Sequence, residues 1–141
     1  MSARRKGRKR ALDVLYAADM RQLSVAELLQ EEAVRAESEP AREGSWAFAR
    51  EILEGVTTHS GEIDELIEST SSWPMERMPS IDRAILKLAA SELFVHPDIP
   101  EAVIIAEAGE LASEYSTDES RGFIQGVLGG LVKKIRPTTA P

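Results

Sequence analysis

Apolar residues recur along this chain at intervals of three and four, and no stretch alternates apolar and polar residues for long. Such spacing is typical of amphipathic helices, because an α-helix brings every third or fourth residue to one face. The pattern predicts a first helix over about residues 8–20 and a second helix that starts after Ser24. There, Ser24 and Glu27 have the spacing of a capping box, in which each side chain bonds the backbone N–H of the other residue. A polar loop is expected over residues 37–44.

Two further helices are predicted on either side of Ser60 and Gly61. Their apolar residues are Phe48, Ile52 and Val56 in the earlier helix, and Ile63, Leu66 and Ile67 in the later one. A polar connection follows over residues 69–74. Trp73 in this connection and Met78 just after it are expected to join the core, as large apolar side chains usually do.

The most apolar segment covers about residues 81–95, where apolar side chains spread over much of the helix circumference. A helix of that kind usually lies at the centre of a domain. After a connection with two prolines, a helix is predicted over about residues 101–115, and a last helix begins near Asp118. Ser116 and Glu119 have the spacing of a second capping box at that start.

These patterns together predict an all-α fold of about seven helices. The length suits one domain with a core of its own, so a single domain is expected over residues 1–141. Residues 1–7 and 137–141 are expected to be flexible.

Charge is distributed very unevenly. Six of the 17 basic side chains lie within the first ten residues, which hold no acidic one: Arg4, Arg5, Lys6, Arg8, Lys9 and Arg10. Residues 11–141 therefore carry 11 basic and 24 acidic side chains, a net charge of −13 within the total of −7. A cationic segment on an acidic protein indicates one local site for a polyanion such as nucleic acid. The alternative is a solvated start that only aids solubility.

Two features break the local rules for helices. The basic residues oppose the helix macrodipole by roughly 0.3–1 kcal/mol each, so phosphate binding explains them better than helix stability does. In the last helix, Gly122, Gly126 and Gly130 repeat at intervals of four, although each glycine costs about 1 kcal/mol relative to alanine. Such a bare strip favours close packing of another helix. A shallow surface for a nucleotide beside Phe123 is the functional alternative.

Enzyme chemistry finds little support. The chain has no cysteine, and His59 and His96 stand far apart, without metal-ligand spacing. Neither catalysis, a metal site nor a cofactor is expected. No apolar run approaches the ~18 residues of a membrane span. Asp13 interrupts the apolar residues that follow the basic start, which is unlike a secretory signal, so a cytoplasmic location is expected.

Four segments stand out in order along the chain: RKGRKRALDVLY at residues 5–16, WPMERMPSIDRAIL at 73–86, IPEAV at 99–103 with Glu107 and Ala108 after it, and STDES at 116–120 followed by FIQGVL at 123–128. Together they resemble the NusB family of transcription antitermination factors. The similarity runs over about residues 4–135. Gln125 stands where asparagine is usual in the family, and Gly109 stands where a larger aliphatic residue is common.

The resemblance implies a NusB fold, with the helices in two packed bundles. It also implies a function, because NusB proteins bind the boxA element of nascent RNA, notably of ribosomal RNA, together with NusE, a ribosomal protein of the small subunit. That complex helps RNA polymerase resist termination. By position, the resemblance assigns RNA binding to Arg4, Arg5, Arg8, Lys9, Arg10, Asp118, Glu119 and Phe123, and contact with NusE to Glu76, Arg77 and Asp82.

Chemistry suits these roles. Basic side chains neutralise phosphates, acids accept hydrogen bonds from base amino groups, and Phe123 is able to stack on an unpaired base. For Asp82, stabilisation of the first helical turn is the alternative. Two other functions stay open here: a helical protein-interaction module without specific RNA binding, and a NusB-like RNA-binding domain related to RNA methyltransferases. The sequence does not decide between a monomer and a homodimer.

Overall fold

The computed structural model describes residues 2–37 and 43–137 of the chain. Within these residues the structure has seven α-helices, one short 3-10 helix and no strand. The helices are α1 (Ala3–Arg21), α2 (Val25–Glu37), α3 (Glu43–Thr58), α4 (Ser60–Thr70), η2 (Met75–Arg77), α5 (Ser80–Val95), α6 (Glu101–Tyr115) and α7 (Asp118–Ile135). The all-α prediction is confirmed.

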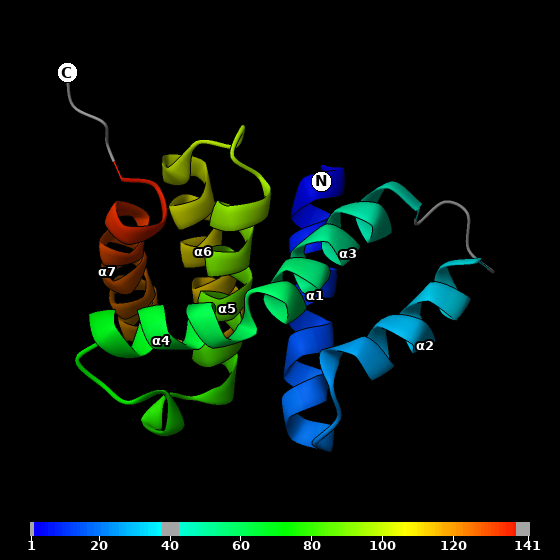
Figure 1. Ribbon diagram of the computed structural model, residues 1–141, viewed down its shortest axis with the longest axis horizontal. Coiled ribbons are helices and arrows are strands. Elements are labelled where there is room, and N and C mark those ends of the chain that lie inside the picture. Colours follow the sequence, from blue (N-terminus) through cyan, green and yellow to red (C-terminus); the bar gives the residue numbers. More distant parts are fainter. Residues whose placement is uncertain (1, 38–42, 138–141) are drawn as a thin grey trace.

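The helices form two bundles that share α5 (Figure 1). On one side α1, α2 and α3 pack together, and on the other side α4, α6 and α7 do so. α5 contacts α1 and α3 as well as α4, α6 and α7. Its sequence explains this central place, because every side chain from Ala84 to Leu93 is buried except that of Lys87. The two-bundle arrangement and the central position of the most apolar helix are both confirmed.

The first helix begins earlier than its apolar pattern indicates. α1 starts at Ala3, so the predicted start at residue 8 was wrong, and residues 3–7 continue the helix. The side chain of Ser2 caps it by accepting a 3.1 Å hydrogen bond from the backbone N–H of Arg5. The basic residues therefore stand on an ordered helix, which gives each of them a definite direction.

Gly7 marks the place where α1 crosses α3. A Cβ at Gly7 would lie 2.8 Å from the carbonyl oxygen of Ser45 and 2.9 Å from Cδ2 of Phe48. Because one of these atoms belongs to the backbone, it has little freedom to move away. The residue that looks like a poor helix former thus permits the close approach of the two helices.

The two predicted capping boxes have different outcomes. At the start of α2, the backbone N–H of Ser24 donates to Glu27 at 3.0 Å and that of Glu27 donates to the Ser24 hydroxyl at 3.2 Å, which confirms the first box. The second prediction was wrong. Thr117 caps α7 by accepting from the backbone N–H of Ser120 at 3.0 Å, and the neighbouring Ser116 bonds to another element.

Trp73 and Met78, both predicted to lie in the core, differ in burial. Met78 is buried, as predicted, whereas Trp73 is 56% exposed, so its assignment to the core was wrong. Trp73 lies in the polar connection between α4 and η2, outside any helix whose periodicity would turn it inward.

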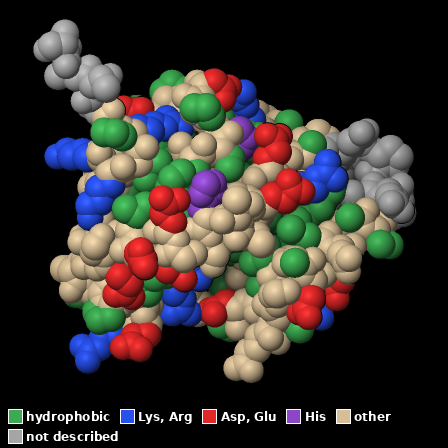
Figure 2. All heavy atoms as spheres, in the orientation of Figure 1, with side chains coloured by type: hydrophobic (Ala, Val, Ile, Leu, Met, Phe, Trp, Pro, Cys, Tyr) green, Lys and Arg blue, Asp and Glu red, His purple; other side chains and the backbone are tan. Residues whose placement is uncertain are grey.

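Parts of the segments expected to be a loop or flexible, namely Met1 and residues 38–42 and 138–141, lie outside the described residues. In the part of the chain that the structure describes, no helix is long and apolar enough to cross a membrane. On the face shown in Figure 2, acidic and basic side chains are interspersed without a continuous basic patch.

Candidate nucleic-acid interface

Arg8, one of the predicted RNA-binding residues, points into the molecule. Its side chain is only 5% exposed and forms an ion pair with Glu92 of α5, which is 1% exposed. Arg8 Nε donates to both carboxylate oxygens of Glu92 at 3.0 Å, and the guanidinium carbon lies 5.3 Å from the centre of the Phe48 ring. Each of these buried charges offsets the cost of removing the other one from water. This position suits a residue that anchors α1 more than one that contacts phosphate.

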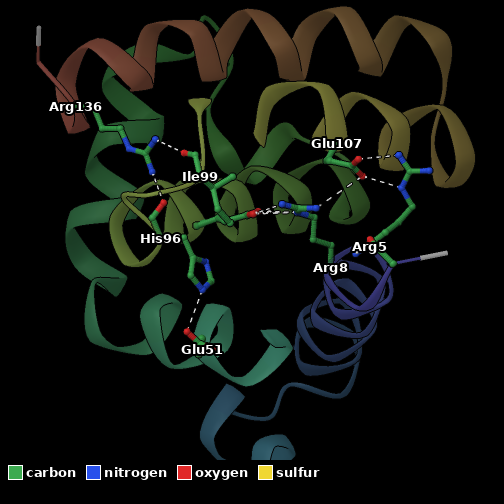
Figure 3. Close-up of polar contacts among 9 residues, drawn as sticks. Arg5, Arg8, Glu51, His96, Ile99, Glu107 and Arg136 are labelled. Atoms are coloured by element: carbon green, nitrogen blue, oxygen red, sulfur yellow. Dashed lines mark hydrogen bonds and ion pairs between the residues drawn. The ribbon is translucent and has the colours of Figure 1, made fainter. Parts of the chain in front are cut away.

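Two further cations of α1 are paired with acids on α6. Arg5 makes two hydrogen bonds to Glu107, at 2.7 and 3.1 Å, and Lys9 makes one of 2.8 Å to Glu114. Figure 3 shows Arg5 and Arg8 reaching from α1 toward Glu107. The hydrogen bond with Arg5 and its positive charge lower the pKa of Glu107, despite partial burial. The hydrogen bond with Glu114 likewise raises the pKa of Lys9.

The remaining cations of the basic segment, residues 4–10, are Arg4, Lys6 and Arg10. Arg4 and Lys6 are exposed, and no carboxylate in the described part of the chain forms an ion pair with either one. Arg10 is partly buried and donates a 2.8 Å hydrogen bond to the hydroxyl of Ser45. Lys6 was not among the residues assigned to RNA from the sequence. Lys6 and Arg4 are the cations of this segment most available to a phosphate, because both are exposed on α1.

An aromatic pair lies on the α7 side of the molecule. The ring centres of Phe123 and Trp73 are 5.5 Å apart, with their planes inclined by 33°. The Ser71 hydroxyl holds the backbone of Trp73 in place, because it donates to the carbonyl oxygen at 2.8 Å and accepts from the N–H at 3.0 Å. Trp73 was not recognised as a surface residue from the sequence. The signal was its position among polar residues outside any apolar periodicity.

The three glycines spaced by four in α7 (Gly122, Gly126 and Gly130) do not all pack against another helix. A Cβ at Gly130 would lie 2.5 Å from Cγ2 of Thr70 on α4, so the predicted close helix packing occurs there. A Cβ at Gly122 or Gly126 would meet no atom of the described residues within 4 Å. The part of the strip next to Phe123 is therefore open surface.

The acidic residues assigned to RNA stand at the start of α7. Asp118 and Glu119 are both exposed in the first turn of the helix, where their charges also suit the helix dipole. They are thus accessible to a ligand. The capping role predicted for Ser116 and Glu119 belongs instead to Thr117.

α6 lies between the two predicted halves of the site. Glu107 and Glu114 face α1, whereas Glu110 pairs at 3.2 Å with Arg121 of α7, two residues before Phe123. A groove of about 90 Å³ between α1 and α6 has these three acids on its wall. The structure therefore does not join the basic segment directly to Phe123, and acidic side chains occupy the space between them.

The three residues assigned to contact with NusE differ in their exposure. Glu76 and Arg77 are exposed on η2. Asp82 is 3% exposed and accepts hydrogen bonds of 2.7 Å from the hydroxyls of both Ser116 and Ser120. Asp82 therefore connects the start of α5 to the start of α7, and its side chain does not reach the surface.

A larger hollow, about 570 Å³ in volume, lies elsewhere, among α1, α2, α3 and α5. The ion pair between Arg83 and Asp19, 2.8 Å long, forms part of its wall. None of the residues predicted for RNA or for the protein partner lines it. Its size alone therefore does not make it the candidate site.

Comparison with known proteins identifies the family. The NusB family model matches residues 5–133, which is most of the chain. The chain belongs to the NusB family. It is 51% identical over 134 residues to the transcription antitermination protein NusB of Leifsonia xyli subsp. xyli, covering 94% of this chain and 93% of that protein. It is 54% identical over 129 residues to the NusB of Clavibacter sepedonicus, covering 91% and 94%.

Solved NusB structures agree with the fold. The structure of T. maritima NusB matches with a TM-score of 0.80 at 29% identity, covering 95% of this chain and 93% of that one. The crystal structure of the antitermination factors NusB and NusE in complex with dsRNA also matches with a TM-score of 0.80, at 25% identity, covering 95% and 98%. The helices and bundles described above are thus the NusB fold.

Proposed function

We propose that this protein is a transcription antitermination factor that binds boxA RNA of nascent transcripts together with NusE and helps RNA polymerase resist termination. Family membership over nearly the whole chain supports this function. The NusB relative solved with NusE and RNA supports both kinds of partner. The observation that carries the proposal is an ordered basic helix start, with Arg4 and Lys6 free of acidic partners among the described residues, on an otherwise acidic NusB chain.

The RNA site we propose has two parts. Arg4 and Lys6 contact phosphates directly, and Arg5, Lys9 and Arg10 do so after giving up their contacts within the protein. On the other side of α6, Phe123 stacks on an unpaired base, and Asp118 and Glu119 accept hydrogen bonds from base edges. Phosphate contacts carry no sequence information, so discrimination of boxA belongs to the second part.

We assign contact with NusE to Glu76 and Arg77, since both are exposed on η2. Asp82 supports that surface from within by holding α5 to α7. Arg8 has the same kind of role for the basic segment, because its pair with Glu92 fixes α1 on α5. The protein acts by binding, without a catalytic step, and in the cytoplasm where the transcript emerges.

An RNA titration tests this function. Fluorescence anisotropy of labelled boxA RNA, with and without NusE and across a salt series, is expected to show tighter binding with NusE present. Arg4→Ala/Lys6→Ala should weaken binding and make the slope of log K against log salt shallower by about 1.4, since each lost single-strand phosphate contact removes about 0.7. Lys133→Ala/Lys134→Ala on α7 removes the same charge and serves as the control. Equal affinity for boxA and a scrambled strand would contradict the proposal.

One observation favours a second function, a helical protein-interaction module without specific RNA binding. Three of the six basic residues, Arg5, Arg8 and Lys9, already have acidic partners within the chain. If that function is correct, no RNA binds even at low salt, whereas NusE still does. Gel filtration during the same experiment distinguishes a monomer from a homodimer.

A further inference from the structure

The basic segment of α1 faces acidic competitors that belong to the same chain. Arg5 makes two hydrogen bonds to Glu107, and Lys9 makes a 2.8 Å bond to Glu114. Arg5 is half exposed and Glu114 is 49% exposed, so solvent and ligands reach both pairs. A phosphate that binds Arg5 or Lys9 therefore competes with a carboxylate that already bonds that side chain and offsets its charge.

The position of these acids adds to the effect. A strand that contacts the basic segment and also reaches Phe123 has to pass α6, which separates α1 from α7. Glu107, Glu110 and Glu114 face that path, and like charges repel the phosphates that cross it. Removing one carboxylate thus releases a cation and also lowers the repulsion.

We propose that Glu107 and Glu114 are affinity-determining residues of the RNA site, which compete with phosphate for Arg5 and Lys9 and so weaken the binding of any single strand. This inference rests on the proposed function. It gives the acids of α6 a purpose beyond structure: they keep the basic segment from holding RNA through phosphate contacts alone. Base contacts at the other part of the site then become necessary for stable binding.

Glutamine substitution tests the inference, because it removes the charge and keeps the shape. Glu107→Gln and Glu114→Gln are each expected to tighten the Kd for boxA RNA by about two- to fivefold, the range expected for an exposed ion pair. The same factor is expected for a scrambled strand, because phosphate contacts do not depend on sequence. The difference in Kd between these variants and the unsubstituted protein should shrink as salt rises toward 1 M, since salt screens exposed charges.

Glu65→Gln on α4 is the matched control. It makes the same change in net charge at an exposed position that forms no ion pair among the described residues, and α4 does not lie between α1 and α7. Its effect on the Kd should be well below that of the α6 variants. Thermal unfolding of each variant checks that the fold is intact. Glu114→Gln is the safer of the two α6 variants for this purpose, because Glu114 is exposed.

The outcomes separate the two proposals. If the unsubstituted protein binds boxA RNA and the α6 variants bind it equally or more weakly, these acids only position Arg5 and Lys9, and the inference is wrong while the proposed function stands. If tightening occurs but is equal for Glu65→Gln, net charge explains it and the inference is again wrong. If the unsubstituted protein binds no RNA with or without NusE, the proposed function fails and the inference fails with it.

Discussion

Arg8 and Glu92 form a buried ion pair between the first and the fifth helix. Arg8 Nε bonds both carboxylate oxygens of Glu92 at 3.0 Å, and 84 residues separate the two in sequence. The pair connects α1 to the central helix from within the basic segment proposed for RNA. Its effect on RNA binding is therefore exerted through the position of α1.

Removing one partner of this pair should destabilise the protein strongly. Glu92→Ala is expected to lower the free energy of unfolding by about 3–5 kcal/mol, because it leaves the buried charge of Arg8 with only the 4.0 Å ion pair to Glu107. The double variant Arg8→Met/Glu92→Leu should recover much of that loss, since it replaces both charges by apolar groups. Urea denaturation followed by circular dichroism measures both. A single variant as stable as the unsubstituted protein would show that the pair is open to water.

Two glycines should respond to alanine in opposite directions. Gly7→Ala is expected to destabilise the protein by about 1–3 kcal/mol, because its Cβ collides with the backbone of α3. Gly126→Ala should stabilise it by up to about 1 kcal/mol, since its Cβ meets open space and alanine favours the helix. Chemical denaturation of the two variants side by side decides this. Stabilisation by Gly7→Ala would contradict the close crossing of α1 and α3.

Acid should weaken the attachment of α1 to α6. The hydrogen bond and charge of Arg5 lower the pKa of Glu107 below its ordinary value of 4.5. A carboxyl whose pKa is lower in the folded state contributes stability above its unfolded pKa, and that stability is lost as pH falls through the folded value. The hydrogen bond from Arg83 lowers the pKa of Asp19 in the same direction. The free energy of unfolding should therefore decrease as pH falls below about 4.5.

Glu107→Gln provides the control for this pH effect. Denaturant titrations from about pH 6 to about pH 3 should show a smaller loss of stability on acidification for this variant, because one of the titrating groups is gone. An identical pH slope in the two proteins would mean that the pair with Arg5 contributes nothing to folding.

Substitutions of the residues assigned to NusE should have different effects on NusE affinity and on stability. Glu76→Ala/Arg77→Ala is expected to weaken NusE binding with little change in the melting temperature, because both side chains are exposed. Asp82→Ala should lower the free energy of unfolding by about 1–3 kcal/mol, because it removes the acceptor shared by Ser116 and Ser120. Calorimetric titration with NusE, together with thermal unfolding, distinguishes the two effects. A lower NusE affinity for Asp82→Ala at unchanged stability would place that carboxylate in the interface after all.

The departures from the family pattern show how sequence and structure complement each other. Gln125 and Gly109 each look unusual when the sequence is considered position by position. In the structure they face each other, since a Cβ at Gly109 would collide with the amide of Gln125, which also donates to the carbonyl oxygen of Ile105 at 3.4 Å. The longer side chain of Gln125 thus occupies space that Gly109 leaves free, and the two departures are a single packing solution.

The helical elements, the central place of α5 and the Ser24–Glu27 capping box were predictable from the sequence, because each depends on residues within a few positions of one another. The family and its two-bundle fold were predictable because their motifs are local segments in a set order. Which cations are free and which are paired depended on the tertiary structure. The partners of Arg5 and Lys9 lie 102 and 105 residues away, and only folding brings α6 against α1. Charge is thus visible in the sequence, but its availability to a ligand is a property of the packed helices.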